Sequence, residues 1–267
     1  MTKGFLIVAQ NSGSVDYIAC ARVLAKSLKL TNSQYPVTLL TDRLDYPGLD
    51  IFDTTLTFPF GDHSSSDWKL ENDWQCYFAS QYDETIKLEA DVIVTRSLDS
   101  WWELCKNHDL MIATGCRTFR GDIATSRYYR KLLDRNGLPD AYNGITYFKR
   151  SELASEFFGR VKFYTENWTI AQSRLNTDEP FNTDTAYALS TSDIEVPCTS
   201  NANFMQWAHM KQYINNLRSE DWTQDLVWEL IGTDFRINTV SQLYPVHYHV
   251  KELAKLLEPL YDRQLEI

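Results

Sequence analysis

Apolar runs of strand length alternate with apolar patterns of helical period along the first half of the chain. Residues 5–9 form a continuous apolar run, and after a polar turn the apolar residues recur at helical spacing over 18–28. Residues 37–41 form a second run of strand length. Strands that alternate with helices indicate a mostly parallel sheet, whose strands are buried on both faces. The pattern therefore predicts an α/β fold in which helices flank a mostly parallel sheet.

Three further strands and two further helices complete this prediction. The strands are expected at 85–88, 110–113 and 144–148. A helical stretch over about 72–82 leads into the first of them. Residues 180–189 are expected to form a helix whose proline suits its first turn.

Polar residues follow several of these strands directly. In an open sheet of this type, ligands bind beyond the carboxyl ends of the strands. The turn that begins with Ala9, Gln10 and Asn11 would open on that side, as would the corner at Asp42. We therefore expect these four residues to contribute to a ligand site.

Two carboxylates, Glu89 and Asp91, lie one residue apart where the strand at 85–88 breaks. Strand side chains alternate in direction, so both would project to the same side with little Ala90 between them. Hard oxygen ligands of this kind suit Mn²⁺ first and Mg²⁺ second. A carboxylate pair also occurs by chance, and its alternative interpretation is a polar edge beside an ordinary strand.

Composition favours one compact body. The chain has 267 residues, of which 43% are hydrophobic and 13% aromatic, and no low-complexity tract divides it. We expect a single domain over 1–267, with a nucleotide-binding half at 1–115, an acceptor half at 116–267 and a C-terminal helical extension. The run at 5–9 is too short for a signal-peptide core or a membrane span, so we expect a soluble, cytoplasmic protein without a membrane partner.

Charge and cysteine usage narrow the function classes. The formal net charge of −10 argues against a surface that binds nucleic acid everywhere. The five cysteines are scattered and form no CxxC pair, so the sequence predicts neither a zinc site nor a disulfide framework. They are expected to be small buried hydrophobes.

Several separated blocks resemble the GT-A nucleotide-sugar glycosyltransferases, most closely the glycogenin-like and galactosyltransferase-like branch. The blocks are the helix that starts near Tyr17, the segment from Trp74 to Asp91, the strand that starts near Tyr142, the segment 176–179 and the segment 246–251. Glu89 stands where the family has an aspartate, and the family's glycine in the last segment is missing. The chain also resembles small glycosyltransferase-like proteins of bacteriophages in overall texture.

The resemblance implies a nucleotide-sugar donor and assigns roles to individual residues. It implies base stacking by Tyr17, and contact of Asn143 and Gly144 with the donor sugar. It also implies a third metal ligand and a cation for the diphosphate in the last segment. In an extended segment His247 and His249 would lie on the same face, and we favour His249 as the ligand because it is close to Lys251, the cation.

The catalytic residues expected from the resemblance are Asp178 and Glu179, with Asp184 as a less favoured candidate. A helix N-cap is the alternative explanation for acidic residues there. A retaining reaction does not require a carboxylate base, because the leaving diphosphate accepts the acceptor's proton. An inverting enzyme would need one. We favour retention with a uridine diphosphate sugar.

A cationic segment rich in aromatic residues lies between the strand at 110–113 and Asn143. Its arginines are the candidate acceptor-binding residues: Arg117, Arg120, Arg127 and Arg130. Such a segment suits a phosphate backbone and an unstacked base, and its alternative is a solvated helix face.

Three functional readings stay open. The first is a glycosyltransferase acting on a glycan or small-molecule hydroxyl. The second is a phage DNA glycosyltransferase acting on hydroxymethylated pyrimidines. The third is a sugar-nucleotide-binding protein without turnover. The sequence leaves the sugar, the acceptor and the oligomeric state open.

Overall fold

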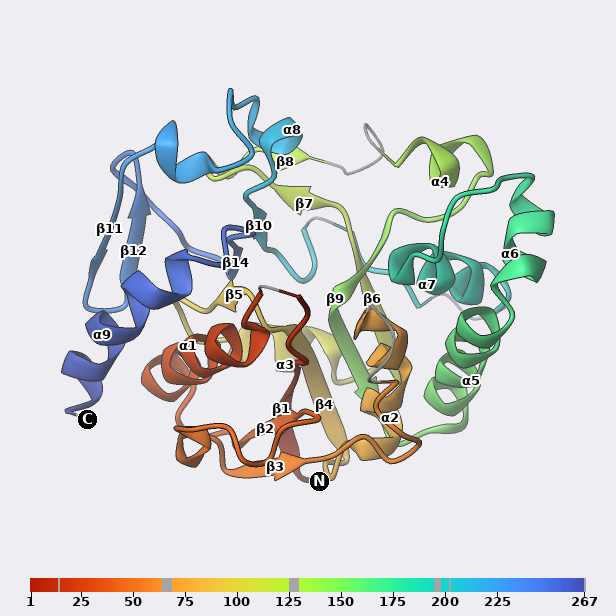
Figure 1. Cartoon of the computed structure of the whole chain (residues 1–267), viewed down its shortest axis with the longest axis horizontal. Helices are drawn as coiled ribbons and strands as arrows, with labels where there is room; N and C mark the ends of the chain where they lie inside the picture. The colour runs from red at the N-terminus through yellow and green to blue at the C-terminus, as the bar shows by residue number, and fades with distance from the viewer. Residues whose placement is uncertain (14, 64–68, 125–129, 195–197, 202, 267) are drawn as a thin grey trace.

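The computed structural model describes residues 1–13, 15–63, 69–124, 130–194, 198–201 and 203–266. A six-stranded sheet forms its centre, with the strand order β3-β2-β1-β4-β9-β6 (Figure 1). All neighbouring pairs on the β3 side of β4 are parallel, and β9 runs antiparallel to both β4 and β6. The bounds are β1 Lys3–Val8, β2 Val37–Leu40, β3 Thr54–Leu56, β4 Glu84–Glu89, β6 Leu110–Thr114 and β9 Ala141–Lys149. The mostly parallel α/β sheet predicted from the sequence is confirmed.

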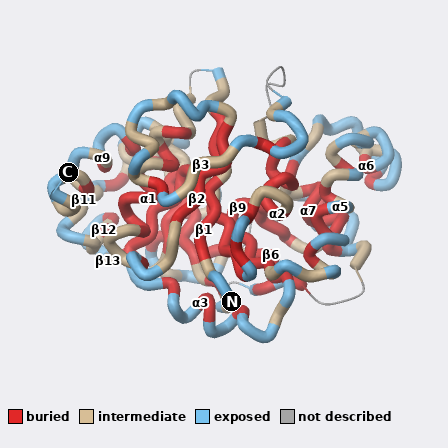
Figure 2. The backbone as a smooth tube through the Cα atoms, turned by 90° about the horizontal axis from the view of Figure 1, so that it is seen from below, coloured by how far each residue is buried: buried red, intermediate tan, exposed pale blue. Residues whose placement is uncertain are grey.

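The central strands are buried on both faces, which explains their continuous apolar sequence. In β1, Phe5 and Ile7 pack into one hydrophobic core, and Leu6 packs into the other. All three side chains are fully buried. The middle of the molecule is correspondingly buried in Figure 2, between helices on either side. Alternating side chains of one strand thus serve two cores.

Helices cover each face of this sheet. The core that contains Phe5 also takes apolar residues of α1 Tyr17–Thr31, α3 Asp99–Cys105 and α9 Leu253–Leu265. The opposite core takes residues of α2 Cys76–Ala79, α4 Lys131–Arg135, α5 Glu152–Glu166, α6 Trp168–Leu175 and α7 Thr183–Ser192. Helix α8 comprises Gln212–Asn215. The helical C-terminal segment expected from the sequence is α9, which lies beside α1 (Figure 1).

Two smaller sheets lie beyond the central one. The first has the order β5-β14-β10-β7-β8, and the second is an antiparallel sheet of β11, β12 and β13. The first sheet matters for function because β14 joins β5, directly after the carboxylates, to β10. The bounds are β5 Val92–Ile93, β7 Cys116–Arg117, β8 Ile123–Ala124, β10 Ala208–His209, β11 Trp228–Ile231, β12 Asp234–Ile237, β13 Val240–Ser241 and β14 Val246–His247.

The helix predicted over 72–82 is wrong as a continuous element. The structure has a 3₁₀ helix, Lys69–Gln75, followed by the short α2. The amide of Asn72 donates to the carbonyl of Asp62 at 2.5 Å, and the amide of Gln75 donates to that of Gly61 at 2.7 Å. These side chains tie the tighter turn to a neighbouring loop, which local helix periodicity does not reveal.

The helix predicted over 180–189 exists, but it starts later. Asn182 is the N-cap of α7, and its side-chain oxygen accepts a hydrogen bond from the backbone N–H of Thr185 at 3.1 Å. Asparagine is among the strongest N-cap residues, so this cap, rather than Pro180, sets the start.

The five cysteines are all buried and free, as their scattered positions predict. Burial raises the pKa of the thiols of Cys20, Cys105 and Cys116 to about 12. Among the described residues, no helix is both long enough and apolar enough to cross a membrane.

Candidate functional site

A cavity of about 300 Å³ opens at the carboxyl ends of β1 and β4. Because β9 is antiparallel to β4, its amino-terminal residues Tyr142 and Asn143 reach the same edge. The loop after β14 and the start of α7 close the other sides. The cavity therefore lies where open α/β sheets bind ligands.

Nine of the residues singled out in the sequence line this cavity. They are Ala9, Gln10, Tyr17, Glu89, Asp91, Arg130, Asn143, His249 and Lys251. Other lining residues were not singled out, and these include Lys69, Tyr142, Asn182, His209 and Lys211. His247 and Asp184, the less favoured alternatives, also line it.

Other candidates lie outside the lining. Asn11 supports the start of α1, where its side-chain oxygen accepts from the N–H of Ile18 at 3.0 Å. Asp42 follows β2 but does not reach the cavity. The guanidinium of Arg117 donates to Gly121 and Asn203, and that of Arg120 lies over the ring of Phe119. Arg127 lies outside the described residues.

Asp178 and Glu179 are exposed in the connection between α6 and α7. The carbonyl of Glu179 accepts hydrogen bonds from the indole of Trp168 at 2.9 Å and from the amide of Gln172 at 3.0 Å. Neither acid caps α7, and neither lines the cavity. Of the three acids considered for catalysis, Asp184 lines the cavity. It lies in the first turn of α7, because this helix starts after Asn182.

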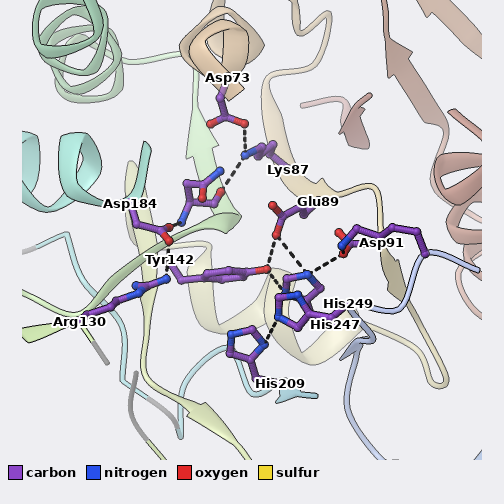
Figure 3. A network of polar contacts seen from close by, with 12 residues as sticks. Asp73, Lys87, Glu89, Asp91, Arg130, Tyr142, Asp184, His209, His247 and His249 are labelled. Atoms are coloured by element: carbon purple, nitrogen blue, oxygen red, sulfur yellow. Dashed lines mark hydrogen bonds and ion pairs between the residues drawn. The ribbon is translucent and has the colours of Figure 1, made fainter. Parts of the chain in front are cut away.

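Glu89 and Asp91 meet one imidazole (Figure 3). The Nε2 of His247 lies 2.8 Å from Oδ2 of Asp91 and 3.7 Å from Oε2 of Glu89. The hydroxyl of Tyr142 donates to Glu89 and lies 2.5 Å from Nδ1 of His247. The carboxylate of Asp91 can only accept a hydrogen bond, so Nε2 of His247 donates to it.

The imidazole beside the carboxylates is therefore that of His247, not the favoured His249. Strand β14 ends at His247, and His249 has a φ of 59°. The two residues do not share one extended segment, so the alternation that would let either ring reach the carboxylates does not apply. The ring of His249 instead places Nε2 3.1 Å from Nδ1 of His209.

Gly144 does not line the cavity, but its missing side chain shapes the site. A Cβ at this position would lie 2.4 Å from the Tyr142 hydroxyl and 2.5 Å from Oε2 of Glu89. These separations are far below van der Waals contact, so any larger residue would displace the Glu89 carboxylate. The glycine thus makes room for a carboxylate ligand.

Burial and neighbouring charges set the ionisation of the site. Burial raises the pKa of the Glu89 carboxyl, although the charge of His247 opposes this. Burial also acts to raise the pKa of Asp91, but His247 and Lys251 outweigh it and hold that pKa well below its usual value. Burial and the neighbouring imidazoles lower the pKa of His209 and of His249 well below the usual range. Both of these rings are therefore neutral near pH 7.

Lys251 places its ammonium group between an acid and an aromatic ring. It forms an ion pair with Asp91 and lies 5.5 Å from the ring centroid of Tyr17. Burial acts to lower the pKa of Lys251, but the charge of Asp91 raises it above its usual value. A cationic group and an aromatic face thus lie side by side in the cavity at the carboxyl end of β1.

Asp184 is fixed from two sides. Arg130 forms an ion pair with it, and the backbone N–H of Asn143 donates to its Oδ1 at 2.8 Å. The Nδ2 of Asn143 is buried and has no hydrogen-bond partner among the described residues. An amide donor without a partner in a cavity wall indicates a place for a ligand oxygen.

A buried ion pair lies beneath this wall. Lys87 pairs with Asp73, and the ammonium of Lys87 also donates to the carbonyl of Asn143 at 2.8 Å (Figure 3). The hydroxyl of Tyr187 donates to Asp73 at 2.5 Å. Both charged side chains are 1% exposed. The position of Lys87 between Ile86 and Leu88 in a buried strand is the sequence signal for this pair.

No model of a known protein family matches the chain, and no curated protein matches its sequence. Solved structures do. The galactosyltransferase LgtC, in complex with donor and acceptor sugar analogs, is 14% identical with a TM-score of 0.55, over 96% of this chain and 95% of that one. The chain has the GT-A glycosyltransferase fold.

Two further structures share this GT-A fold. Mouse xyloside xylosyltransferase 1, in its apo form, is 9% identical with a TM-score of 0.52, over 94% of this chain and 98% of that one. The glycosyltransferase GlyE of Streptococcus pneumoniae is 12% identical with a TM-score of 0.52, over 100% of this chain and 64% of that one. The resemblance inferred from the sequence blocks is thus confirmed at the level of the fold.

The chemistry of the carboxylate set fits a divalent metal ion in this fold. Glu89, Asp91 and His247 each offer one ligand atom, and these atoms lie within 4.8 Å of one another. Two carboxylate oxygens and one imidazole nitrogen form a donor set for a hard or borderline cation. The absence of a side chain at Gly144 leaves room for the Glu89 carboxylate.

Proposed function

We propose that the protein is a glycosyltransferase that moves a sugar from a nucleotide diphosphate sugar to a hydroxyl acceptor. The observation that carries this proposal is the meeting of Glu89, Asp91, His247 and Lys251 in one cavity at the carboxyl edge of a GT-A sheet. Acidic and basic groups side by side suit a ligand that combines phosphate with a metal ion. The GT-A neighbours support the same class of reaction.

The basic residues of the cavity support an anionic donor. The chain carries a net charge of −10, yet Lys69, Arg130, Lys211 and Lys251 all line this cavity. The cavity is also lined by Glu89, Asp91 and Asp184, so a bound cation would add to the basic residues in favouring an anionic ligand. Tyr17, beside Lys251, offers an aromatic face on which a nucleobase would stack. We favour uridine as the base.

Glu89, Asp91 and His247 would hold the metal ion, for which we favour Mn²⁺ over Mg²⁺. When bound, the ion would neutralise charge on the departing diphosphate. Lys251 would share this task as a point charge. Its present ion pair with Asp91 would then be exchanged for one with the ligand.

Asp184 and Asn143 would orient the sugar. Asp184 is held by Arg130 and by the N–H of Asn143, so its position is fixed before a ligand arrives. The bond from the anomeric carbon to the diphosphate oxygen breaks, and a bond to the acceptor oxygen forms. The acceptor's proton passes to the leaving diphosphate, so retention requires no protein base. This arrangement needs no catalytic role for Asp178 or Glu179.

We favour a glycan or small-molecule hydroxyl as acceptor. The hypothesis of a DNA acceptor relied on the basic segment between β6 and β9. This segment contributes Arg130 to the cavity, where the arginine pairs with Asp184. Arg117 and Arg120 do not line the cavity. No contact among the described residues favours DNA, so we do not propose it as the acceptor.

A thermal-shift panel of nucleotide diphosphates and nucleotide sugars, with and without Mn²⁺, tests donor binding. A ligand present at a hundred times its Kd stabilises the folded protein by about 2.7 kcal/mol. We expect stabilisation that requires Mn²⁺ and is lost in Asp91→Asn but retained in Asp50→Asn, an exposed acid outside the cavity. The absence of any shift would contradict donor binding. Binding without turnover of any sugar would instead favour a sugar-nucleotide-binding protein.

A further inference from the structure

Three histidines form a second cluster of ligand atoms beside the carboxylates (Figure 3). The ring centroids of His247 and His249 lie 3.9 Å apart, and those of His209 and His249 lie 4.6 Å apart. One ligand nitrogen from each of the three lies within 4.8 Å of the others. His247 and His249 belong to the segment 246–251 already singled out, whereas His209 carries no local sequence signal.

The fold builds this cluster from two separate segments. Strands β10 and β14 are parallel neighbours, and their register places His209 opposite His247. The backbone then turns at His249, where φ is 59°, and returns its ring to His209. His209 and His247 are 2% and 4% exposed. Long-range strand pairing therefore brings the three imidazoles together inside the cavity.

We propose that His209, His247 and His249 form a nitrogen-rich metal site that takes a borderline transition-metal ion such as Ni²⁺, Co²⁺ or Zn²⁺. Imidazole nitrogen favours these ions, whereas carboxylate oxygen suits Mn²⁺ and Mg²⁺. Three histidines are an established protein ligand set for Zn²⁺.

The rings must turn before they can share an ion, because they are stacked at interplanar angles of 13°, 28° and 30° and an imidazole nitrogen binds metal in its ring plane. With metal–nitrogen distances near 2.0–2.1 Å, two nitrogens of a tetrahedral site lie about 3.3 Å apart. The Nε2 of His249 and Nδ1 of His209 are already 3.1 Å apart. Turning the rings so that their in-plane lone pairs converge would close the set.

His247 belongs to both sets, so the two kinds of ion should compete. An ion held by the histidines would remove His247 from Glu89 and Asp91. The inference does not rest on the proposed sugar transfer, because metal binding is measurable without a nucleotide. A protein that binds no Ni²⁺ could still bind and cleave a nucleotide sugar, so the two proposals can fail separately.

The experiment titrates the metal-free, full-length protein with NiCl₂ by calorimetry, with CoCl₂ by visible absorption and with MnCl₂ by electron paramagnetic resonance. His209→Gln and His249→Asn test the histidine set, and Asp91→Asn tests the carboxylate set. Asparagine suits the left-handed backbone at His249. His63→Gln is the matched control, because His63 is exposed and lies outside the cavity.

We expect the wild type to bind one Ni²⁺ and to show Co²⁺ absorption bands typical of low coordination number. His209→Gln and His249→Asn should each weaken Ni²⁺ binding by at least about tenfold, since even the loss of an outer-shell partner costs ~10–100-fold. Mn²⁺ binding by these two variants should stay at the wild-type level, which also shows that they are folded. Asp91→Asn should weaken Mn²⁺ binding, and His63→Gln should change neither.

Several results would overturn the proposal. One is a wild type that binds no Ni²⁺. Another is wild-type Ni²⁺ affinity in His249→Asn, which decides the matter alone if the buried His209→Gln does not fold. Equal losses of Ni²⁺ and Mn²⁺ in every variant would show one mixed site and would contradict a separate histidine set.

Discussion

Replacement of Lys87 by methionine should destabilise the protein strongly. The ammonium of Lys87 forms a fully buried pair with Asp73 and donates to the carbonyl of Asn143 at 2.8 Å. Lys87→Met leaves the Asp73 carboxylate buried with the hydroxyl of Tyr187 as a remaining donor. Breaking a buried pair by removing one partner costs about 3–5 kcal/mol, because a charge stays without compensation. A loss of this size is a large part of a typical stability of ~5–15 kcal/mol.

The double variant Lys87→Met with Asp73→Leu separates this explanation from a simple loss of packing. Replacing both members of a buried pair by apolar residues is often close to neutral. We therefore expect the double variant to be more stable than Lys87→Met alone. The coupling free energy from the cycle should exceed about 2 kcal/mol, within the range found for residues of one network.

Urea unfolding followed by tryptophan fluorescence measures these free energies. The matched control is Lys106→Met, whose pair with Glu103 is exposed and should contribute only ~0–1 kcal/mol. A loss below about 1 kcal/mol in Lys87→Met, or a double variant whose loss equals the sum of the two single losses, would refute the reasoning.

Three further predictions concern the site and the core. Gly144→Ala should destabilise by about 1–3 kcal/mol and abolish Mn²⁺-dependent donor binding, because its Cβ would meet Tyr142 and Glu89. Gly159→Ala, in α5 with open space around it, should instead stabilise by up to ~1 kcal/mol, and a chemical denaturation series compares the two. Tyr17→Ala should weaken donor binding by about 1–3 kcal/mol in calorimetry, whereas Tyr17→Phe should bind normally; equal effects would exclude base stacking. The five buried cysteines should not react with Ellman's reagent at pH 8 until the protein unfolds, because burial raises the thiol pKa, to about 12 at Cys20; rapid reaction of the native protein would contradict this.

The sequence predicts most strands of the central sheet and the helix α1, but not α5, which is as long as α1. The strands at β1, β2, β4, β6 and β9 and the helix α1 were all expected, since a continuous apolar run and a helical period are local signals. Short elements carry no such signal. β10 and β14 have two residues each, and only pairing with distant strands defines them. His209 was overlooked for this reason.

The candidate site shows the same division. Glu89 and Asp91 could be singled out because they interrupt a strand, and they do line the cavity. His249 was favoured for its closeness to Lys251, but one left-handed residue ends the alternation, and the ring beside the carboxylates is that of His247. Asp178 was favoured because segment 176–179 precedes the expected helix, whereas α7 starts at Thr183 and carries Asp184 in its first turn. Its partner Arg130 lies 54 positions away in sequence, and no local pattern reveals such a pair.

Turnover of a nucleotide sugar is the most direct test of the account. The purified protein would be incubated with Mn²⁺ and a panel of uridine diphosphate sugars, without added acceptor, so that water takes the acceptor's place. Released nucleotide diphosphate and free sugar would be quantified by mass spectrometry. We predict that at least one sugar is released, that chelation of the metal stops the reaction and that Asp91→Asn is inactive. Failure to cleave any nucleotide sugar, or equal release by wild type and Asp91→Asn, would contradict a glycosyltransferase site at Glu89, Asp91 and His247.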